Sequence, residues 1–552
     1  MRLVVLLVAL AAVAVGIVLV LSAGPGAAER QLVSGYVHDW AAGDYPHMYA
    51  LLDPASRAHL SEARFAADYH RAAATATADR LMPGKVGNPQ GEYIPVRMLV
   101  VTRLFGTLQE TLEVPFVGSG SSATVRFSGT LLFPGLTGDE RLSRRMSLPP
   151  RGTLFASDGT PLAEGPDRTS PIPAVASEIV GVLGPIPADQ ANTYAMQGYP
   201  RNAHVGMDGL ERVFQTQLAG RPGGVLLAGR RVLARAVPVR GQNVTTTINP
   251  ALEEDAIGAL GGDYAGIVAM DPRTGAVLAA AGIAWSASQP PGSTMKIVTS
   301  TAALAAGIVH LGTVFPYSTA ATLDGYTLHN ASDEDCGGTL LNSFAVSCNS
   351  VFAPLGARLG GKRLLAMAER FGFNQPAGIA GAAESSIPPA SLGSDLEVGS
   401  SAIGQGQVLA TPLEMAEAAA TIAMGGKRPV PTLAAGQPPR FVPVTSARVA
   451  GEVQQMMVAV VEFGTGTAAQ IPGVTVAGKT GTAELASTST ASGQSVANAN
   501  QLTDAWFVGY APVGGAGGPR IVVGALFPNQ GAGGATAAPA VRQVLVAALQ
   551  SH

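Results

Sequence analysis

Charged side chains are scarce in this chain. Lys, Arg, Asp and Glu together make up 13% of the 552 residues, and the formal net charge is −3. Binding to nucleic acid or to an anionic membrane surface usually needs a cluster of basic residues. The composition therefore gives no support to a nucleic-acid-binding protein or to a polybasic membrane patch. The length is sufficient for about three or four domains.

Charge is absent altogether from residues 3–21, an almost wholly apolar run. As a helix at about 1.5 Å per residue this run would span roughly 28 Å, close to the hydrocarbon core of a bilayer. Arg2 precedes it, which favours export of everything that follows. Two interpretations stay open: a retained membrane anchor, which the length favours, and a cleaved signal peptide, which the small residues 26–28 would suit. No cysteine lies near the end of the run, so a lipid-modified cysteine is excluded.

Cysteine is nearly absent: only Cys336 and Cys348 occur, 12 positions apart. Two cysteines of an exported protein can form a disulfide bond. Alternatively, Cys348 is a small apolar side chain between Ser347 and Asn349. The sequence leaves both interpretations open, and a disulfide bond would brace the segment around Cys348.

Histidine is also infrequent, and its spacing is typical of neither a metal site nor a catalytic triad. Four histidines lie in the first 70 residues, but no compact ligand motif has their spacing, which favours solvated or capping roles: His38, His47, His59 and His70. We therefore predict no metal site. The last 300 residues contain only three histidines, His310, His329 and His552.

A serine and a lysine lie three residues apart where a Pro-Pro-Gly sequence, residues 290–292, leads into an apolar, helix-forming stretch. Ser293 opens this helix and Lys296 shares its face, with Cβ atoms about 5–6 Å apart. A serine hydroxyl needs a base to become a nucleophile, and a lysine kept neutral by burial, a second cation or the helix dipole can serve. Since Ser293 lacks the G-x-S-x-G sequence of the hydrolases, lysine is a better candidate base than histidine.

Two further motifs follow at long spacing. Ser347-Cys348-Asn349 begins 54 positions after Ser293, and Lys479-Thr480-Gly481-Thr482 begins 132 positions later, after the strand-like residues 474–477. Each motif alone has an ordinary explanation, because Ser347 and Asn349 could cap a helix and Lys479 could end a strand. All three motifs in this order indicate one shared site.

Residues 473–480 also fit the phosphate-binding pattern G-x-x-x-x-G-K-[ST]. Such a loop needs a flexible turn that opens a helix, whereas residues 474–477 are typical of a strand and a small, polar segment follows at residues 485–500. The context therefore argues against a nucleotide-binding site.

The three motifs together resemble those of the penicillin-binding proteins, which are acyl-serine transferases. Cys348 stands where these enzymes and their relatives often have aspartate, so the second motif matches at its two outer positions. The resemblance covers roughly the last 300 residues in order. It includes a strand, turn and strand at residues 265–279, residues 402–406 before a helix at residues 411–416, and a strand at residues 504–512.

The resemblance implies a role for each motif. Ser293 would attack a peptide carbonyl, Lys296 would take its proton, and Ser347 would relay a proton to the departing amine beside Lys479. Asn349 would offer an amide donor to the substrate backbone. The residues implied in catalysis are thus Ser293, Lys296, Ser347, Asn349 and Lys479.

The resemblance also implies a binding site for the substrate, formed by Thr480, Gly481 and Thr482. The hydroxyls of Thr480 and Thr482 would bind a terminal carboxylate. The backbone N–H groups of Ser293 and Thr482 would form the oxyanion hole, where one lost donor typically costs about 10²–10³ in rate.

The rest of the chain is expected to form non-catalytic domains. In residues 29–143, helical spacing gives way after about residue 74 to alternating runs at residues 93–117 and 122–133, which predict strands. Helices followed by a sheet resemble the nuclear-transport-factor-like domain of some class B penicillin-binding proteins. Residues 144–245 resemble the family's pedestal, or dimerisation-like, domain, although Ser157 stands where arginine would be usual.

We therefore expect a multidomain α+β protein. Its parts would be an anchor or signal segment (residues 1–28), a nuclear-transport-factor-like domain (29–143), a pedestal domain (144–245) and a transpeptidase domain (246–552) with an antiparallel sheet flanked by helices. A single N-terminal anchor would hold it in the cell membrane with the catalytic domain outside the cytoplasm.

By resemblance, the expected activity is peptidoglycan D,D-transpeptidation through a serine acyl-enzyme that β-lactams would also form. The alternatives are a D,D-carboxypeptidase or β-lactamase on the same fold and, less favoured, a non-catalytic β-lactam sensor. The expected partners are peptidoglycan stem peptides, β-lactams, the membrane and a glycosyltransferase of the SEDS type. No cofactor and no nucleic acid are expected.

Overall fold

The computed structural model describes residues 26–484, 503–514 and 517–550. The chain divides into two compact units. Unit 1 contains residues 1–151, 184–205 and 219–242, and unit 2 contains residues 152–183, 206–218 and 243–552. The predicted pedestal, residues 144–245, contributes to both units, and the predicted domain boundaries stay a prediction.

The apolar run at residues 3–21 lies outside the described residues. Among the helices that are described, none has the length and apolar character needed to cross a bilayer.

Unit 1 begins with four helices, and polar capping residues set the starts of the last three. Asp44, Asp53 and Ser61 each accept a hydrogen bond from a backbone N–H in the first turn of the helix that follows, which satisfies a donor that has no partner inside the helix. The helices are α2 (Ala27–Ala42), α3 (Tyr45–Ala50), α4 (Pro54–His59) and α5 (Glu62–Ala76).

A four-stranded antiparallel sheet follows in the order β1-β2-β3-β4. Its strands are β1 (Ala78–Val86), β2 (Tyr93–Thr102), β3 (Gly106–Val117) and β4 (Thr124–Val125). Side chains from the helices and from one face of the sheet form a buried cluster that includes Tyr36, Phe65 and Val96. The prediction of helices followed by a sheet is confirmed, whereas the resemblance to a nuclear-transport-factor-like domain stays a prediction.

Two details of this sheet differ from the prediction. β1 was missed because its sequence does not alternate apolar and polar residues and contains Pro83 and Gly84, beside which its pairing with β2 shifts register. The long strand expected at residues 122–133 is wrong, since only β4 forms and a 3₁₀ helix, η2 (Gly129–Leu132), follows. The chain leaves the sheet after Val125 because the Phe127 N–H donates to Ser56 Oγ instead of to a strand.

The rest of unit 1 is a three-stranded sheet, β11-β10-β5, and a short helix, with bounds β5 (Leu142–Ser147), α7 (Ala191–Met196), β10 (Gly223–Ala228) and β11 (Arg231–Ala236). The short strands β8 (Leu183–Pro185) and β9 (His204–Gly206) lie where the chain passes from one unit to the other.

Unit 2 begins with a small sheet in the order β12-β6-β7. Arg168 and Glu211 form a buried ion pair there, with Nε and Oε1 2.6 Å apart. The elements are β6 (Leu154–Phe155), β7 (Pro161–Ala163), α6 (Pro173–Ile179), α8 (Gly209–Val213), α9 (Gln215–Ala219) and β12 (Val244–Thr245).

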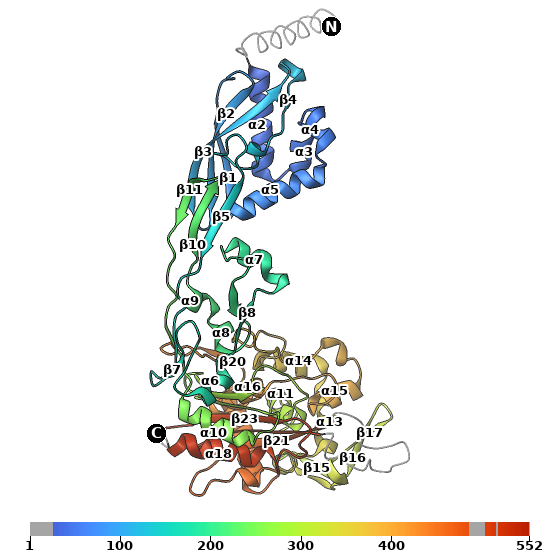
Figure 1. The fold of residues 1–552 in the computed structure, drawn as a ribbon. Coiled ribbons are helices and arrows are strands. Elements are labelled where there is room, and N and C mark those ends of the chain that lie inside the picture. The colour runs from blue at the N-terminus through green and yellow to red at the C-terminus, as the bar shows by residue number, and fades with distance from the viewer. Residues whose placement is uncertain (1–25, 485–502, 515–516, 551–552) are drawn as a thin grey trace, which may run out of the picture. The chain divides into compact units, whose positions relative to one another are not determined.

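A five-stranded antiparallel sheet in the order β14-β13-β23-β22-β21 forms the centre of unit 2 (Figure 1). Its strands are β13 (Gly266–Met270), β14 (Val277–Gly282), β21 (Ala477–Glu484), β22 (Thr503–Ala511) and β23 (Ile521–Phe527). The predicted strands at residues 265–279 and 504–512 are therefore confirmed. β21 is an edge strand, so one of its sides is free of strand pairing.

Both faces of this sheet are covered, because successive side chains along a strand point to opposite faces. Phe507 of β22 packs in the cluster that contains residues of α10 (Pro250–Leu260) and α18 (Ala537–Gln550). Trp506 and Val508 pack on the other face, in the cluster that contains residues of α11 (Lys296–Ala305) and α16 (Pro412–Ala423). The helix predicted at residues 411–416 is confirmed as the start of α16, and Thr411 caps it by accepting the Glu414 N–H.

The remaining helices of unit 2 are α12 (Leu340–Ala345), α13 (Asn349–Leu359), α14 (Gly361–Phe371), α15 (Asp395–Ala402) and α17 (Ala447–Glu462). Its remaining strands form two-stranded pairs: β15 (Val314–Ser318) with β18 (Cys336–Thr339), β16 (Ala320–Leu323) with β17 (Tyr326–His329), and β19 (Lys427–Pro429) with β20 (Phe441–Pro443).

The Lys-Thr-Gly motif lies inside β21 rather than at its end. Lys479 pairs with Val508 of β22, and the strand continues to Glu484. A phosphate-binding loop would need a turn and the start of a helix at this point. The nucleotide-binding alternative is therefore wrong.

Candidate active site

The first motif lies on η4 (Gly292–Met295), a 3₁₀ turn that continues into α11. A 3₁₀ helix has about three residues per turn, so side chains three positions apart lie one above the other. Lys296 Nζ accordingly lies 2.9 Å from Ser293 Oγ. Gly292 adopts a φ of +52°, and a Cβ there would come within 3.0 Å of Ala483 N, so glycine is needed for η4 to approach β21.

Lys296 is completely buried and is surrounded by oxygen atoms. Its Nζ lies 2.7 Å from Ser347 O, 2.7 Å from Asn349 Oδ1 and 3.2 Å from Ser347 Oγ. Burial, and then the charge of Lys479, lower the pKa of Lys296 well below the ordinary value for lysine. The site therefore favours a neutral amine beside the hydroxyl of Ser293.

The second motif follows α12 and turns its polar side chains toward the lysines. Ser347 has a φ of +64°, a left-handed conformation that non-glycine residues rarely adopt. Asn349 begins α13, and its Nδ2 donates to His329 O at 3.0 Å, which leaves one of its two amide hydrogens for a ligand. The helix-capping alternative is wrong for this motif, because Cys348 is the N-cap residue and makes no side-chain cap.

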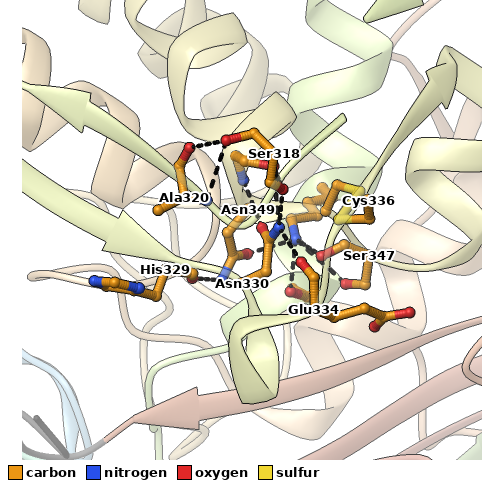
Figure 2. The surroundings of a disulfide bond; sticks show 12 residues. Ser318, Ala320, His329, Asn330, Glu334, Cys336, Ser347 and Asn349 are labelled. Atoms are coloured by element: carbon orange, nitrogen blue, oxygen red, sulfur yellow. Dashed lines mark hydrogen bonds between the residues drawn. A yellow bond between two sulfur atoms is a disulfide. The ribbon is translucent and has the colours of Figure 1, made fainter. Parts of the chain in front are cut away.

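Cys336 and Cys348 form a disulfide bond, with Cα atoms 5.9 Å apart. Figure 2 shows that the bond lies beside Ser347 and Asn349. Asn330 adds polar contacts to the same segment, because its Nδ2 donates to Glu334 O at 2.8 Å and its Oδ1 accepts from Ser350 N–H at 2.8 Å. The interpretation of Cys348 as a mere apolar side chain is therefore wrong.

The third motif lies on the edge strand β21 and supplies the second buried lysine. Lys479 Nζ donates to Ser347 Oγ at 2.8 Å and to Thr480 O at 3.0 Å. Burial lowers the pKa of Lys479 to about 7. At Gly481 an added Cβ would lie 2.7 Å from Pro291 O, so a larger residue would push β21 away from η4.

The two threonines of this motif each interact with a group that sequence reasoning missed. Thr480 Oγ1 lies 2.6 Å from Thr465 Oγ1, and Thr482 Oγ1 accepts a hydrogen bond from Gly533 N–H at 3.4 Å. Thr465 lies in a Gly-Thr-Gly sequence directly after α17, and that pattern was its only signal. The position of Thr465 in the sequence relative to the three motifs matches no catalytic pattern. Only the folded structure shows that it lies beside Thr480.

An aromatic ring also lies near each of the two lysines, and the sequence did not predict these contacts. Lys296 Nζ lies 5.4 Å from the centre of the Phe352 ring, and Lys479 Nζ lies 5.5 Å from that of Phe344. The phenylalanines extend the apolar environment that lowers both lysine pKa values.

A possible metal-binding group lies elsewhere. In the part of the chain that the structure describes, the side chains of Asp39, Asp44 and His47 come close enough to share an ion. Asp44 accepts the His47 backbone N–H, and His47 Nδ1 lies 3.4 Å from Asp39 Oδ2, so protein contacts already engage this surface group of unit 1. It contains none of the predicted catalytic residues.

Comparison with known proteins finds two matching domain families and several similar proteins. The penicillin binding protein transpeptidase domain model matches residues 265–546, and the penicillin-binding protein dimerisation domain model matches residues 158–246. Peptidoglycan D,D-transpeptidase PbpA of Mycobacterium tuberculosis is 33% identical over 380 residues, which are 57% of this chain and 74% of that protein.

Solved structures are similar as well. The D,D-transpeptidase domain of a peptidoglycan glycosyltransferase from Eggerthella lenta has a TM-score of 0.58 and 29% identity, covering 73% of this chain and 99% of that one. The imipenem acyl-enzyme complex of M. tuberculosis penicillin-binding protein A has a TM-score of 0.57 and 27% identity, covering 72% and 98%. The transpeptidase model alone spans half of the sequence, so the chain belongs to the penicillin-binding proteins of the transpeptidase family.

Proposed function

We propose that this protein is a peptidoglycan D,D-transpeptidase that works through an acyl-enzyme at Ser293. The observation that carries the proposal is the contact between Ser293 Oγ and the buried Lys296 Nζ, 2.9 Å apart, with Ser347 between Lys296 and the second lysine, Lys479. The relatives support it, since PbpA is named a peptidoglycan D,D-transpeptidase and penicillin-binding protein A forms an acyl-enzyme with imipenem.

In the first step Ser293 Oγ attacks the carbonyl carbon of a stem peptide, and neutral Lys296 accepts its proton. Lysine suits this role here because burial lowers its pKa, so that its lone pair is available at a lower pH than in a free lysine. The carbonyl oxygen becomes negative as the bond forms. The backbone N–H groups of Ser293 and Thr482 stabilise that charge, and β21 can offer its N–H groups because it is an edge strand.

The departing amine must receive a proton before it leaves. Ser347 Oγ lies 3.2 Å from Lys296 Nζ and 2.8 Å from Lys479 Nζ, so it can pass a proton from the lysines to the terminal D-alanine. An amine of a neighbouring strand then attacks the acyl-enzyme, and the proton returns by the reverse route. This second step joins the two peptides and frees Ser293.

The binding site for the donor peptide lies along β21. Thr480 and Thr482 supply hydroxyls for the terminal carboxylate, Gly481 keeps β21 close to η4, and the remaining Nδ2 hydrogen of Asn349 binds the peptide backbone. β-Lactams occupy the same site and acylate Ser293. No cofactor takes part.

Transfer to water instead of an amine would make the protein a D,D-carboxypeptidase or a β-lactamase, and both would use the same residues. A sensor that is acylated without turnover is the less favoured alternative. Transpeptidation is preferred because the PbpA relatives carry that name.

We also propose how the protein is placed in the cell. Residues 3–21 would anchor it in the membrane, with unit 2 outside the cytoplasm, where stem peptides are available. A membrane glycosyltransferase of the SEDS type would supply the glycan strands. Both statements rest on the apolar run and on the family resemblance.

Labelling with a fluorescent penicillin tests the proposal. The Ser293→Ala variant should lose all labelling, because the hydroxyl that forms the acyl-enzyme is then absent. The Ser34→Ala variant, which changes a half-buried serine of unit 1, should label as the unaltered protein does. Persistent labelling of Ser293→Ala would rule the assignment out.

Product analysis separates transfer from hydrolysis. The purified protein should join a stem-peptide donor to an added amine acceptor, as mass spectrometry of the products would show. Hydrolysis alone, at every concentration of acceptor, would favour the carboxypeptidase or β-lactamase alternative.

A further inference from the structure

Thr465 connects two walls of the candidate active site. Its backbone N–H donates to Ala345 O at 3.1 Å, at the end of α12 and two residues before Ser347. Its Oγ1 lies 2.6 Å from Thr480 Oγ1 on β21. A single residue therefore contacts both the segment that carries Ser347 and the strand that carries the Lys-Thr-Gly motif.

The turn that holds Thr465 is tightly packed. A Cβ on Gly464 would lie 2.2 Å from Ala345 O, closer than any real contact, so only glycine allows the turn to approach α12. The backbone N–H of Gly464 donates to Ala459 O at 3.0 Å, and that of Gly466 donates to Val460 O at 2.9 Å. The position of the Thr465 hydroxyl is thus set by the backbone.

The direction of the hydrogen bond between the two threonines matters for binding. A hydroxyl has one proton, so Thr480 can donate to a ligand only if it accepts from Thr465. The other acceptor near Thr465 Oγ1 is Ala345 O at 3.4 Å, a longer contact than the 2.6 Å to Thr480. A bound carboxylate has no proton to give, so Thr480 must donate to it, and Thr465 then donates to Thr480 instead of to the more distant Ala345 O.

Thr482 also accepts a hydrogen bond from the protein, but from a backbone group. Its Oγ1 accepts from the backbone N–H of Gly533, which leaves the Thr482 proton free to donate. Both threonine hydroxyls of the motif therefore accept a hydrogen bond from the protein when they donate to a ligand. For Thr480, which is only 5% exposed, that donor is a side chain and can be removed by mutation.

We propose that Thr465 is a positioning residue that sets the selectivity of this site for ligands with a free carboxylate. Its hydroxyl donates to Thr480 Oγ1 and so directs the Thr480 proton to the carboxylate of the donor peptide or β-lactam. The inference rests on the proposed function, because it assigns the carboxylate to Thr480 and Thr482. A hydrogen bond to a charged oxygen is stronger than one to a neutral oxygen, so a carboxylate ligand depends on this proton more than its ester does.

The test compares a penicillin with its methyl ester. The second-order rate constant of acylation is measured for both compounds with the unaltered protein, Thr465→Val, Thr465→Ser and Thr467→Val. Thr465→Val should lower the acid-to-ester rate ratio roughly tenfold to hundredfold, the size expected for one hydrogen bond to a charged group. Thr465→Ser keeps the hydroxyl and should restore the ratio, and Thr467→Val, an exposed threonine on the same turn, should leave it unchanged.

A double variant tests whether Thr465 acts through Thr480. Thr465→Val should have little further effect in a Thr480→Val background, since the relayed proton is then already lost. An equal loss for acid and ester would show a structural role and overturn the inference, as would an unchanged ratio. Should Thr465→Val fail to fold, Thr465→Ala is measured in its place, with the same expected ratio. A wrong proposed function would give another result, because the penicillin with a free carboxylate would then not acylate even the unaltered protein.

Discussion

Lys296 differs from an ordinary lysine in two respects, and both follow from its neighbours. It has no exposed surface, and a second buried lysine lies across Ser347 from it. Burial and like charge both disfavour the ammonium form, so the amine next to Ser293 is kept ready to accept a proton. The oxygen atoms of Ser347 and Asn349 hold that amine in place.

Removing this amine should abolish acylation without unfolding the protein. We expect Lys296→Ala to lower the rate of β-lactam acylation by about 10²–10⁴, the usual contribution of a general base. In the unaltered protein the rate should rise with pH through a pKa well below that of a free lysine, because the neutral form is the active one. Stopped-flow acylation across the pH range measures both effects.

Lys362→Ala is the matched control for that experiment. Lys362 is an exposed lysine on α14, so its removal should leave the rate and its pH dependence as they are. A near-normal acylation rate in Lys296→Ala would show that another group is the base.

Among the elements, the start of α13 is held by a disulfide bond and by Asn330, and its N-cap residue makes no side-chain cap. The disulfide bond joins Cys348, its N-cap residue, to Cys336 of β18, and Asn330 binds the next turn through Ser350. Ser347 and Asn349 flank the bridged cysteine. The bond therefore constrains the two side chains that contact Lys296.

Removing the bridge should weaken unit 2 and slow acylation. A cross-link that closes a loop of about this length typically contributes 2–4 kcal/mol. The Cys336→Ala/Cys348→Ala variant should lose a comparable free energy of unfolding in a denaturant titration. Reducing the disulfide bond of the unaltered protein should lower its free energy of unfolding by a similar amount. A thiol assay on unfolded, non-reduced protein should find no free thiol, and a count of two would contradict the bond.

On the scale of the whole molecule, all the predicted site residues belong to unit 2, whose core also contains buried carboxyl groups. Glu253 on α10 accepts the Ala280 N–H at 2.6 Å, and burial raises its pKa to about 7. The folded protein therefore binds a proton that the unfolded chain releases near pH 4.5. The resulting stabilisation is complete below that pH and is lost as the pH rises through about 7.

The pH dependence of unfolding should accordingly change when Glu253 is replaced. When the pH rises from 5 to 7.5, the free energy of unfolding should fall less in Glu253→Gln than in the unaltered protein. The difference between the two falls should be on the order of 2 kcal/mol. Glu254→Gln, at the exposed neighbouring position, should keep the original slope. Identical slopes in all three proteins would show that Glu253 does not bind a proton in this range.

The sequence predicted those elements of unit 2 whose signals are local. Pro-Pro-Gly before Ser293, Thr411 before α16 and the turn between β13 and β14 each specify their own conformation. Predictions failed where a distant contact decides the local structure. β1 forms around Pro83 and Gly84 because β2 lies beside it, and the segment after Val125 leaves the sheet because Ser56 takes its N–H.

The sequence by itself determined the family, the identity of the three motifs and the expectation that Ser293 and Lys296 share a helix face, because spacing within one turn is fixed by backbone geometry. Only the tertiary structure decided that Ser347 lies between two buried lysines, that the two cysteines are bonded, and that Thr465 contacts Thr480. Those contacts join segments far apart in the chain, and burial, which sets the lysine pKa values, exists only when these segments pack together.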